Sequence, residues 1–232
     1  MRFLLPLWYR LVRFGFRLLY NEFAFTYDWV STIVSMGAWR CWGRAALPHL
    51  HAIPGDRVLE IAHGTGNIHL DLHEAGYVAF GVDLSRSMGR ITRRKLVKAG
   101  YPLRLTRALA QALPYPDRSF AAVISTFPAD FIAAPETLRE VHRVLRPGGR
   151  FVIVPNAVFT SESASAKGLE ALYRITGQRD DSPRAEPTAA ADAFITGFAH
   201  AGFSVTLLQE SCPRSLVTVI VAEKVAEPTK RG

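Results

Sequence analysis

The sequence predicts an α/β fold with a mostly parallel β-sheet, and three observations support this. Between residues 51 and 155, short apolar runs of strand length alternate with segments of helix length. The first run, Val58–Ile61, leads into the glycine-rich turn His63–Gly66. Acidic residues stand near the ends of the first two runs, at Glu60 and Asp83. Such alternation is typical of βαβ units, and open α/β sheets bind nucleotides at the carboxyl ends of their strands.

Length and charge narrow the class of protein. The chain has 232 residues, of which 49% are hydrophobic, and this is enough for one domain with a sizeable core. The formal net charge is +8, which indicates either an anionic partner or a solvated basic surface. The sequence has no helix-turn-helix pattern, zinc-finger spacing or aromatic RNA-binding box, so we expect no nucleic-acid partner.

The cysteines and the residues near the N-terminus indicate the cellular compartment. Cys41 and Cys212 are the only cysteines, and this wide spacing predicts neither a disulfide framework nor a metal site. We therefore expect a reducing, cytoplasmic setting and no metal. Arginines interrupt the apolar start where a signal peptide would be uncharged. The longest uncharged run nearby, Trp29–Trp39, is too short to span a bilayer.

Residues 1–50 are predicted to form a helical cover. We expect a helix over residues 3–20. At 100° per residue, Arg2, Arg10, Arg13 and Arg17 fall within an arc of about 80°, opposite a row of apolar side chains. A basic amphipathic helix of this kind lies in a membrane interface, so residues 1–20 are a candidate contact with an anionic membrane at its inner face. The alternative is that this helix packs on the main domain as a lid. A second helical segment spans 25–50, where Gly37 is a candidate break.

The remaining elements follow in order along the chain. After the glycine turn we expect a helix over 67–75, a strand over 78–82, a helix to 99 capped by Ser85, strands over 103–107 and 121–125, a helix over 135–145 and a strand over 150–154. Further on we expect a helix over 163–175, a mobile loop over 177–187, a helix over 189–201 and an antiparallel hairpin over 203–208 and 216–225. The predicted organisation is a cover over 1–50, one domain over 51–225 and a disordered tail over 226–232.

The residues around the glycine turn indicate which nucleotide binds. A dinucleotide fingerprint needs a third glycine where this chain has His69, which disfavours a nicotinamide-dependent enzyme. Glu60 suits a positively charged amino group, and the open backbone of the turn suits an amino-acid carboxylate. Asp83 is placed to accept hydrogen bonds from both hydroxyls of a ribose. These three groups together describe S-adenosylmethionine.

Four segments carry a resemblance to a known family. Val58–Gly66, Gly81–Met88, Leu113–Phe120 and Arg143–Gly149 resemble, in this order, the motifs of class I S-adenosylmethionine-dependent methyltransferases of the type 11 kind. The resemblance implies a Rossmann-like, seven-stranded sheet whose last strand is antiparallel. It also implies that S-adenosyl-L-methionine is the cofactor.

The resemblance also implies a set of site residues. The glycine turn and Thr65 would hold the methionine end, Asp83 the ribose, and the residues around Met88 and Gln111 the adenine. The full candidate cofactor set is Glu60, Ala62, His63, Gly64, Thr65, Gly66, Asp83, Leu84, Met88, Leu109, Ala110, Gln111 and Thr126. Asp130, after the fourth strand, is the candidate catalytic residue. Two positions depart from the family: His63 either touches the cofactor or fills space, and Leu109 replaces an acid that often binds the adenine amino group.

The acceptor is less clearly indicated. Tyr27-Asp28 and the pattern Ser35-x-Gly37-x-x-Arg40-x-Trp42 resemble quinone-pathway C-methyltransferases and bacterial phospholipid N-methyltransferases. The segment 125–130 does not match the quinone group. We therefore predict a methyltransferase that acts on a small hydrophobic or lipid-like acceptor by in-line transfer. The alternative is a methyltransferase-fold scaffold without activity. The acceptor atom and the oligomeric state are left open.

Overall fold

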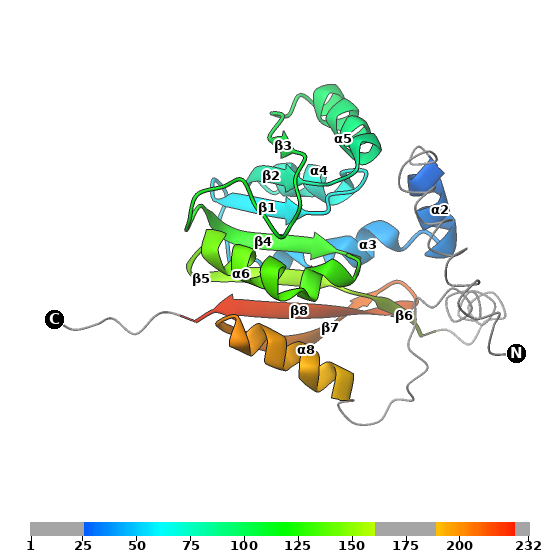
Figure 1. The fold of residues 1–232 in the computed structure, drawn as a ribbon. Helices are drawn as coiled ribbons and strands as arrows, with labels where there is room; N and C mark the ends of the chain where they lie inside the picture. Colours follow the sequence, from blue (N-terminus) through cyan, green and yellow to red (C-terminus); the bar gives the residue numbers. More distant parts are fainter. Residues whose placement is uncertain (1–25, 161–188, 226–232) are drawn as a thin grey trace, which may run out of the picture.

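The computed structural model of the chain describes residues 26–160 and 189–225 (Figure 1). The predicted helices over 3–20 and 163–175, the loop over 177–187 and the tail from residue 226 lie outside these ranges.

The described residues form one eight-stranded mixed sheet. Its strands are β1 (Arg57–Ile61), β2 (Val78–Val82), β3 (Leu105–Thr106), β4 (Phe120–Thr126), β5 (Leu145–Val154), β6 (Ala157–Phe159), β7 (Phe203–Cys212) and β8 (Ser215–Lys224). The strand order is β3-β2-β1-β4-β5-β8-β6, with β7 also paired to β8. Strands β1 to β5 are parallel, whereas β8 runs antiparallel to β5, β6 and β7.

The Rossmann-like class predicted from the sequence is confirmed, with one strand more than the seven expected. The additional strand is β6, which pairs with the end of β8 beyond its ladder with β5.

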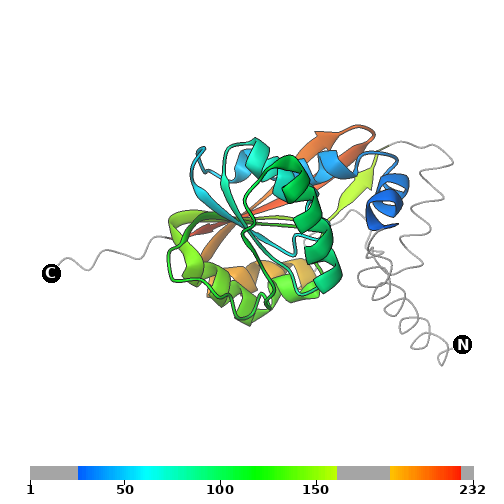
Figure 2. The same cartoon turned by 90° about the horizontal axis from the view of Figure 1, so that it is seen from above.

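Helices cover both faces of this sheet, as Figure 2 shows from above. The helical elements are α2 (Tyr27–Val34), α3 (Trp39–Arg44), η2 (Leu47–His49), α4 (Asn67–Glu74), α5 (Arg86–Ala99), η3 (Asp130–Ala133), α6 (Pro135–Val144) and α8 (Ala189–His200). One buried cluster joins Leu59 of β1 to α6 and α8. The other joins Val58 to α3 and α4. The alternation of side chains along β1 thus builds both halves of the core.

The predicted helical segment 25–50 is broken at the expected glycine. Met36 and Gly37 have φ angles of 50° and 84°, in the left-handed region that ends a helix. The Ser35 hydroxyl accepts a hydrogen bond of 2.9 Å from the Trp39 N–H, which begins α3. As a result α2 extends beyond the carboxyl ends of the strands, while α3 lies against the sheet (Figure 1).

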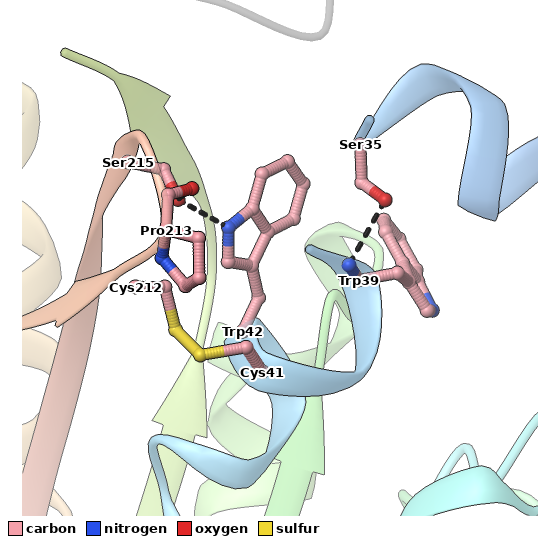
Figure 3. Close-up of a disulfide and its surroundings, with 7 residues drawn as sticks. All are labelled: Ser35, Trp39, Cys41, Trp42, Cys212, Pro213 and Ser215. Carbon is pink, nitrogen blue, oxygen red and sulfur yellow. Dashed lines mark hydrogen bonds between the residues drawn. A yellow bond between two sulfur atoms is a disulfide. The ribbon is translucent and has the colours of Figure 1, made fainter. Parts of the chain in front are cut away.

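The expectation that the two cysteines stay apart was wrong. Cys41 of α3 and Cys212 of β7 form a disulfide, with their Cα atoms 6.1 Å apart (Figure 3). The β7–β8 hairpin carries Cys212 across a sequence separation of 171 residues, which spacing along the chain could not reveal. Beside it the Trp42 Nε1–H donates a hydrogen bond of 2.7 Å to the Ser215 hydroxyl. The inference of a reducing, cytoplasmic setting from unpaired cysteines therefore loses its basis.

Within the described ranges, none of the helices has the length and apolar character needed to cross a membrane.

Candidate active site

The candidate site lies where the carboxyl ends of β1, β2 and β4 meet the start of α4 (Figure 1). The turn after β1 places Gly64 and Gly66 at φ angles of 53° and 79°. A Cβ on Gly66 would lie 2.4 Å from Cγ2 of Thr92, so only glycine lets α5 pack this closely. A Cβ on Gly64 would meet nothing within 4 Å. The turn therefore presents bare backbone to open space at Gly64.

Asp83 faces this turn from the end of β2. Its Oδ2 accepts a hydrogen bond of 2.9 Å from the Gly64 N–H, and its Oδ1 accepts one of 2.7 Å from the Ser85 N–H. A carboxylate has about four acceptor positions, so two bonds to the backbone leave capacity for the hydroxyls of a ribose. Nearby, Leu84 is exposed and Met88 is buried. Asp83 therefore fits its expected place and also braces the glycine turn.

Glu60 makes a contact that the sequence did not indicate. Its Oε2 lies 2.9 Å from Nδ1 of His69 on α4, and both side chains are shielded from solvent. Burial raises the pKa of Glu60 to about 8 and lowers the pKa of His69 to about 4. Both shifts favour the uncharged form of each group, so the contact is a hydrogen bond between a neutral carboxyl and a neutral imidazole. The role of Glu60 toward an ammonium group stays a prediction, since its carboxyl group is engaged with α4.

His63 occupies the space behind the turn. Its Nδ1 lies 3.0 Å from the Gly64 carbonyl oxygen and 3.2 Å from the Thr92 hydroxyl. Its Cδ2 is 2.9 Å from where a Cβ on Gly81 would stand, so the ring packs against the backbone of β2. Of the two expectations for His63, this geometry favours the filling of space. Ala62, just before it, adopts a φ angle of 57° to enter the turn.

Asp28 of α2 ties the helical cover to the glycine turn. Its Oδ1 accepts hydrogen bonds from the Thr65 hydroxyl and from Asn67 Nδ2, and its Oδ2 accepts one of 2.6 Å from Lys95 Nζ on α5. Burial acts to raise the pKa of Asp28, but the hydrogen bonds from Lys95 and Thr65 outweigh it and lower this pKa. The sequence did not predict these bonds, although it placed Tyr27-Asp28 in the cover and the resemblance includes both residues.

The residues expected at the adenine lie in the loop after β3. Leu109 is 51% exposed there, whereas Ala110 is buried. The Oε1 atom of Gln111 is buried and has no hydrogen-bond donor among the described residues. A buried acceptor without a partner is costly, and the exocyclic amino group of an adenine is a donor that would satisfy it. The residues of this loop thus fit the adenine of S-adenosylmethionine, although the usual acid is replaced by Leu109.

An aromatic cluster closes the end of β4. Phe127, directly after this strand, has a φ angle of 50° and stacks on Trp39 with ring centroids 4.3 Å apart. Tyr27, Trp42 and Phe159 complete the cluster through edge and tilted contacts.

Positive φ in a bulky residue marks backbone strain, which concentrates at functional sites. The cluster is therefore a candidate wall for an apolar acceptor.

The last two candidates lie at the end of β4 and shortly after it. Thr126 is half-buried, and a Cβ on Gly43 of α3 would lie 4.0 Å from its Cγ2. The cover therefore reaches Thr126, a member of the candidate cofactor set. Asp130 is exposed at the start of η3. The structure thus brings the turn, Asp83, Thr126 and the cover to one edge, with Asp130 at its rim.

Comparison with known proteins identifies the family. A family described as "Methyltransferase domain" matches residues 58–149. A demethylmenaquinone methyltransferase from Thermus thermophilus is 36% identical over 164 residues, which are 69% of this chain and 72% of that protein. The chain belongs to this methyltransferase family. Family members use S-adenosylmethionine as the methyl donor.

Two further relatives match this methyltransferase over less of their length. A demethylmenaquinone methyltransferase from Symbiobacterium thermophilum is 38% identical over 59% of this chain and 57% of its own. A ubiquinone/menaquinone biosynthesis C-methyltransferase from Geobacter sulfurreducens is 34% identical over 63% of this chain and 60% of its own. The chain thus spans 57% to 72% of these three curated relatives.

Solved structures share the fold of this methyltransferase. A geranyl diphosphate C-methyltransferase from Streptomyces coelicolor, in complex with S-adenosyl-L-homocysteine, superposes with a TM-score of 0.57 at 14% identity, over 80% of this chain and 79% of that one. The [4+2]-cyclase SpnF superposes with a TM-score of 0.62 at 15% identity, over 89% and 94%. Because one of these neighbours is a cyclase, the fold alone does not define the reaction.

Proposed function

We propose that the chain transfers the methyl group of S-adenosylmethionine to a small, hydrophobic acceptor with a quinone-type ring. The relatives described above, which are named as demethylmenaquinone and ubiquinone/menaquinone methyltransferases, support this class of acceptor. The observation that carries the proposal is the stack of Trp39 on Phe127, which places a flat apolar wall at the end of β4. Tyr27, whose ring contacts Trp39, directly precedes Asp28, and the carboxylate of Asp28 accepts a hydrogen bond from the Thr65 hydroxyl of the glycine turn.

The chain supplies binding groups for each part of the cofactor. The backbone around Gly64 receives the methionine end, Asp83 the ribose hydroxyls, and Gln111 the adenine amino group. When bound, S-adenosylmethionine supplies an electrophilic methyl group on a sulfonium. The chain's own task is to align the acceptor with that methyl group and to exclude water, which can contribute several kcal/mol.

The acceptor side of the proposal rests on the aromatic cluster and Asp130. Methylation at a ring carbon forms a C–C bond, breaks the S–C bond and releases the ring proton, so a base must take that proton. Asp130 at the rim of the site is our candidate for this base. The apolar wall would hold the ring by offset stacking. The proposal also includes the contact of residues 1–20 with an anionic membrane surface.

Calorimetry and an acceptor assay test this proposal. S-adenosylhomocysteine should bind, whereas NAD should not, and labelled S-adenosylmethionine should pass its methyl group to a reduced, short-chain demethylmenaquinone. Trp39→Ala should raise the KM for this acceptor and leave the affinity for S-adenosylhomocysteine unchanged. The proposal fails if S-adenosylhomocysteine does not bind at millimolar concentration. Binding of this ligand without transfer to any quinol would favour the scaffold alternative.

A further inference from the structure

Helix α5 carries a concentration of positive charge that neither the core nor the candidate site uses. Arg90, Arg93, Arg94 and Lys98 line one shallow hollow together with Val97. Their spacing of three and four residues places them along one face of the helix. The opposite face, with Met88, Thr92 and Leu96, is buried against the domain.

Most of this charge is uncompensated. Among the described residues, Lys95 is the only cation of α5 that pairs with a carboxylate, and its partner is Asp28. Arg90 bonds only to neutral oxygens of its own helix, whereas Arg93, Arg94 and Lys98 have no acidic partner within the described ranges. By contrast, the arginines at 139, 143, 146 and 150 each pair with an acid. Part of the net charge of +8 therefore lies unpaired on this helix face.

Exposed apolar side chains border this basic face. The Lys95–Asp28 ion pair of 2.6 Å joins α5 to the first turn of α2. The next residue, Trp29, is 70% exposed, and Ile33 one turn later is 53% exposed. Val97 is 60% exposed among the arginines themselves. We call the exposed faces of these two helices the α5–α2 surface.

We propose that the α5–α2 surface docks on a lipid bilayer that contains anionic phospholipids. Arginines and a lysine facing one way attract an anionic leaflet, and an exposed tryptophan beside them suits the headgroup level. Exposed Ile33 and Val97 favour a bilayer over a nucleic acid, because an apolar side chain gains nothing from a phosphate backbone. The surface consists entirely of described residues.

The α5–α2 surface lies near the mouth of the candidate site. Helix α2 lies beyond the carboxyl ends of the strands (Figure 1), and its Asp28 contacts the glycine turn. Docking through the α5–α2 surface would therefore bring the mouth of the site to the bilayer, from which a hydrophobic acceptor can enter. The entry of an acceptor from the bilayer rests on the proposed function, whereas the docking of the surface on the bilayer does not.

Vesicle flotation of the full-length chain tests the docking. We compare vesicles of pure phosphatidylcholine with vesicles that contain phosphatidylglycerol, at low and high salt. The test variant is Arg93→Gln/Arg94→Gln, and the matched control is Arg139→Gln/Arg146→Gln, which loses the same charge elsewhere. We expect roughly a fivefold loss of vesicle affinity for each charge neutralised on the surface, and a much smaller loss in the control. Trp29→Ala should weaken binding severalfold while leaving its salt dependence intact.

Each outcome decides the proposal. Equal losses in the test and control variants, or equal binding to both vesicle types, would overturn it. Binding of single-stranded RNA or duplex DNA that is lost in the test variant, without vesicle binding, would overturn it in favour of a nucleic acid. Calorimetry with S-adenosylhomocysteine on the same variants distinguishes a failure of the docking proposal from a failure of the proposed function. Arg93 and Arg94 should not affect cofactor affinity, so a loss of vesicle binding should leave this affinity unchanged.

Discussion

The carboxyl group of Glu60 and Nδ1 of His69 lie 2.9 Å apart in a part of the molecule that solvent does not reach. Burial holds the pKa of Glu60 near 8, above its ordinary value of 4.5. The folded chain therefore keeps a proton that the unfolded chain releases as the pH rises above 4.5. Linkage then requires stability to fall from about pH 4.5 to about pH 8, by up to about 1.4 kcal/mol per pH unit.

Glu60→Gln should remove this dependence. The amide of glutamine can donate to Nδ1 of His69 or accept from it, as the neutral carboxyl can, so the contact survives without a titrating group. We expect urea unfolding at pH 5, 6, 7 and 8 to give a stability difference in favour of the variant that grows with pH. Curves that run parallel for the two proteins would contradict a neutral Glu60. The lowered pKa of His69 acts in the other direction, because it removes stability as the pH falls from 6.5 to about 4.

The Cys41–Cys212 disulfide should stabilise the attachment of the cover to the sheet. A crosslink between residues so distant in sequence restricts the unfolded chain and is typically worth about 2–4 kcal/mol. We expect dithiothreitol to lower the melting temperature of the wild-type chain. Cys41→Ser/Cys212→Ser should show the lower temperature with or without reductant. Detection of two free thiols in the unreduced, denatured chain would contradict the bond.

Asp28 and Lys95 should act as a coupled pair on cofactor affinity. Asp28→Asn removes the charge that holds Thr65 and Lys95, and we expect roughly a fivefold weaker affinity for S-adenosylhomocysteine, as for the loss of one partly exposed, charge-assisted hydrogen bond. In a double-mutant cycle, adding Lys95→Met to Asp28→Asn should cost less than Lys95→Met alone. Strictly additive effects, measured by calorimetry, would show that the pair does not support the turn.

Gln111 and Leu109 should set the recognition of adenine. If the buried Oε1 of Gln111 accepts from the adenine amino group, Gln111→Leu lowers the affinity for S-adenosylhomocysteine roughly tenfold, the cost of a buried group left unpaired. The same change should leave the affinity for S-inosylhomocysteine almost unchanged, because hypoxanthine lacks that amino group. Leu109→Asp, which restores the acid often seen in the family, should strengthen binding. An equal loss for both nucleosides would place Gln111 outside the adenine contact.

Local patterns predicted most of the main domain. The strand Val78–Val82 and the cap at Ser85 match the structure because apolar runs and capping hydroxyls act over a few residues. The long-range features escaped prediction. His69 stands where a third glycine was sought, and only the packing of α4 on β1 reveals it as the partner of Glu60. The disulfide depends in the same way on contacts between distant segments.

In the candidate site, too, the features set by local sequence were predicted and those set by long-range contacts were not. Gly64, Gly66 and Asp83 follow from strand ends and turn chemistry, which the sequence states directly. The aromatic wall does not, because Phe127 meets Trp39 only when the end of β4 and α3 come together. The candidate acceptor wall consists of contacts between segments that are distant in sequence. The cofactor is therefore easier to infer from the sequence than the acceptor.

Asp130→Asn tests the candidate base. Asparagine has nearly the same shape but cannot accept the ring proton, and general-base catalysis is typically worth about 10²-fold or more. We expect kcat to fall by roughly that factor in the quinol assay, with the affinity for S-adenosylhomocysteine unchanged. Asp117→Asn is the matched control, since Asp117 is also exposed but pairs with Arg143 on α6. Unaltered turnover of the Asp130→Asn variant would exclude Asp130 and direct attention to a base supplied by the acceptor or by solvent.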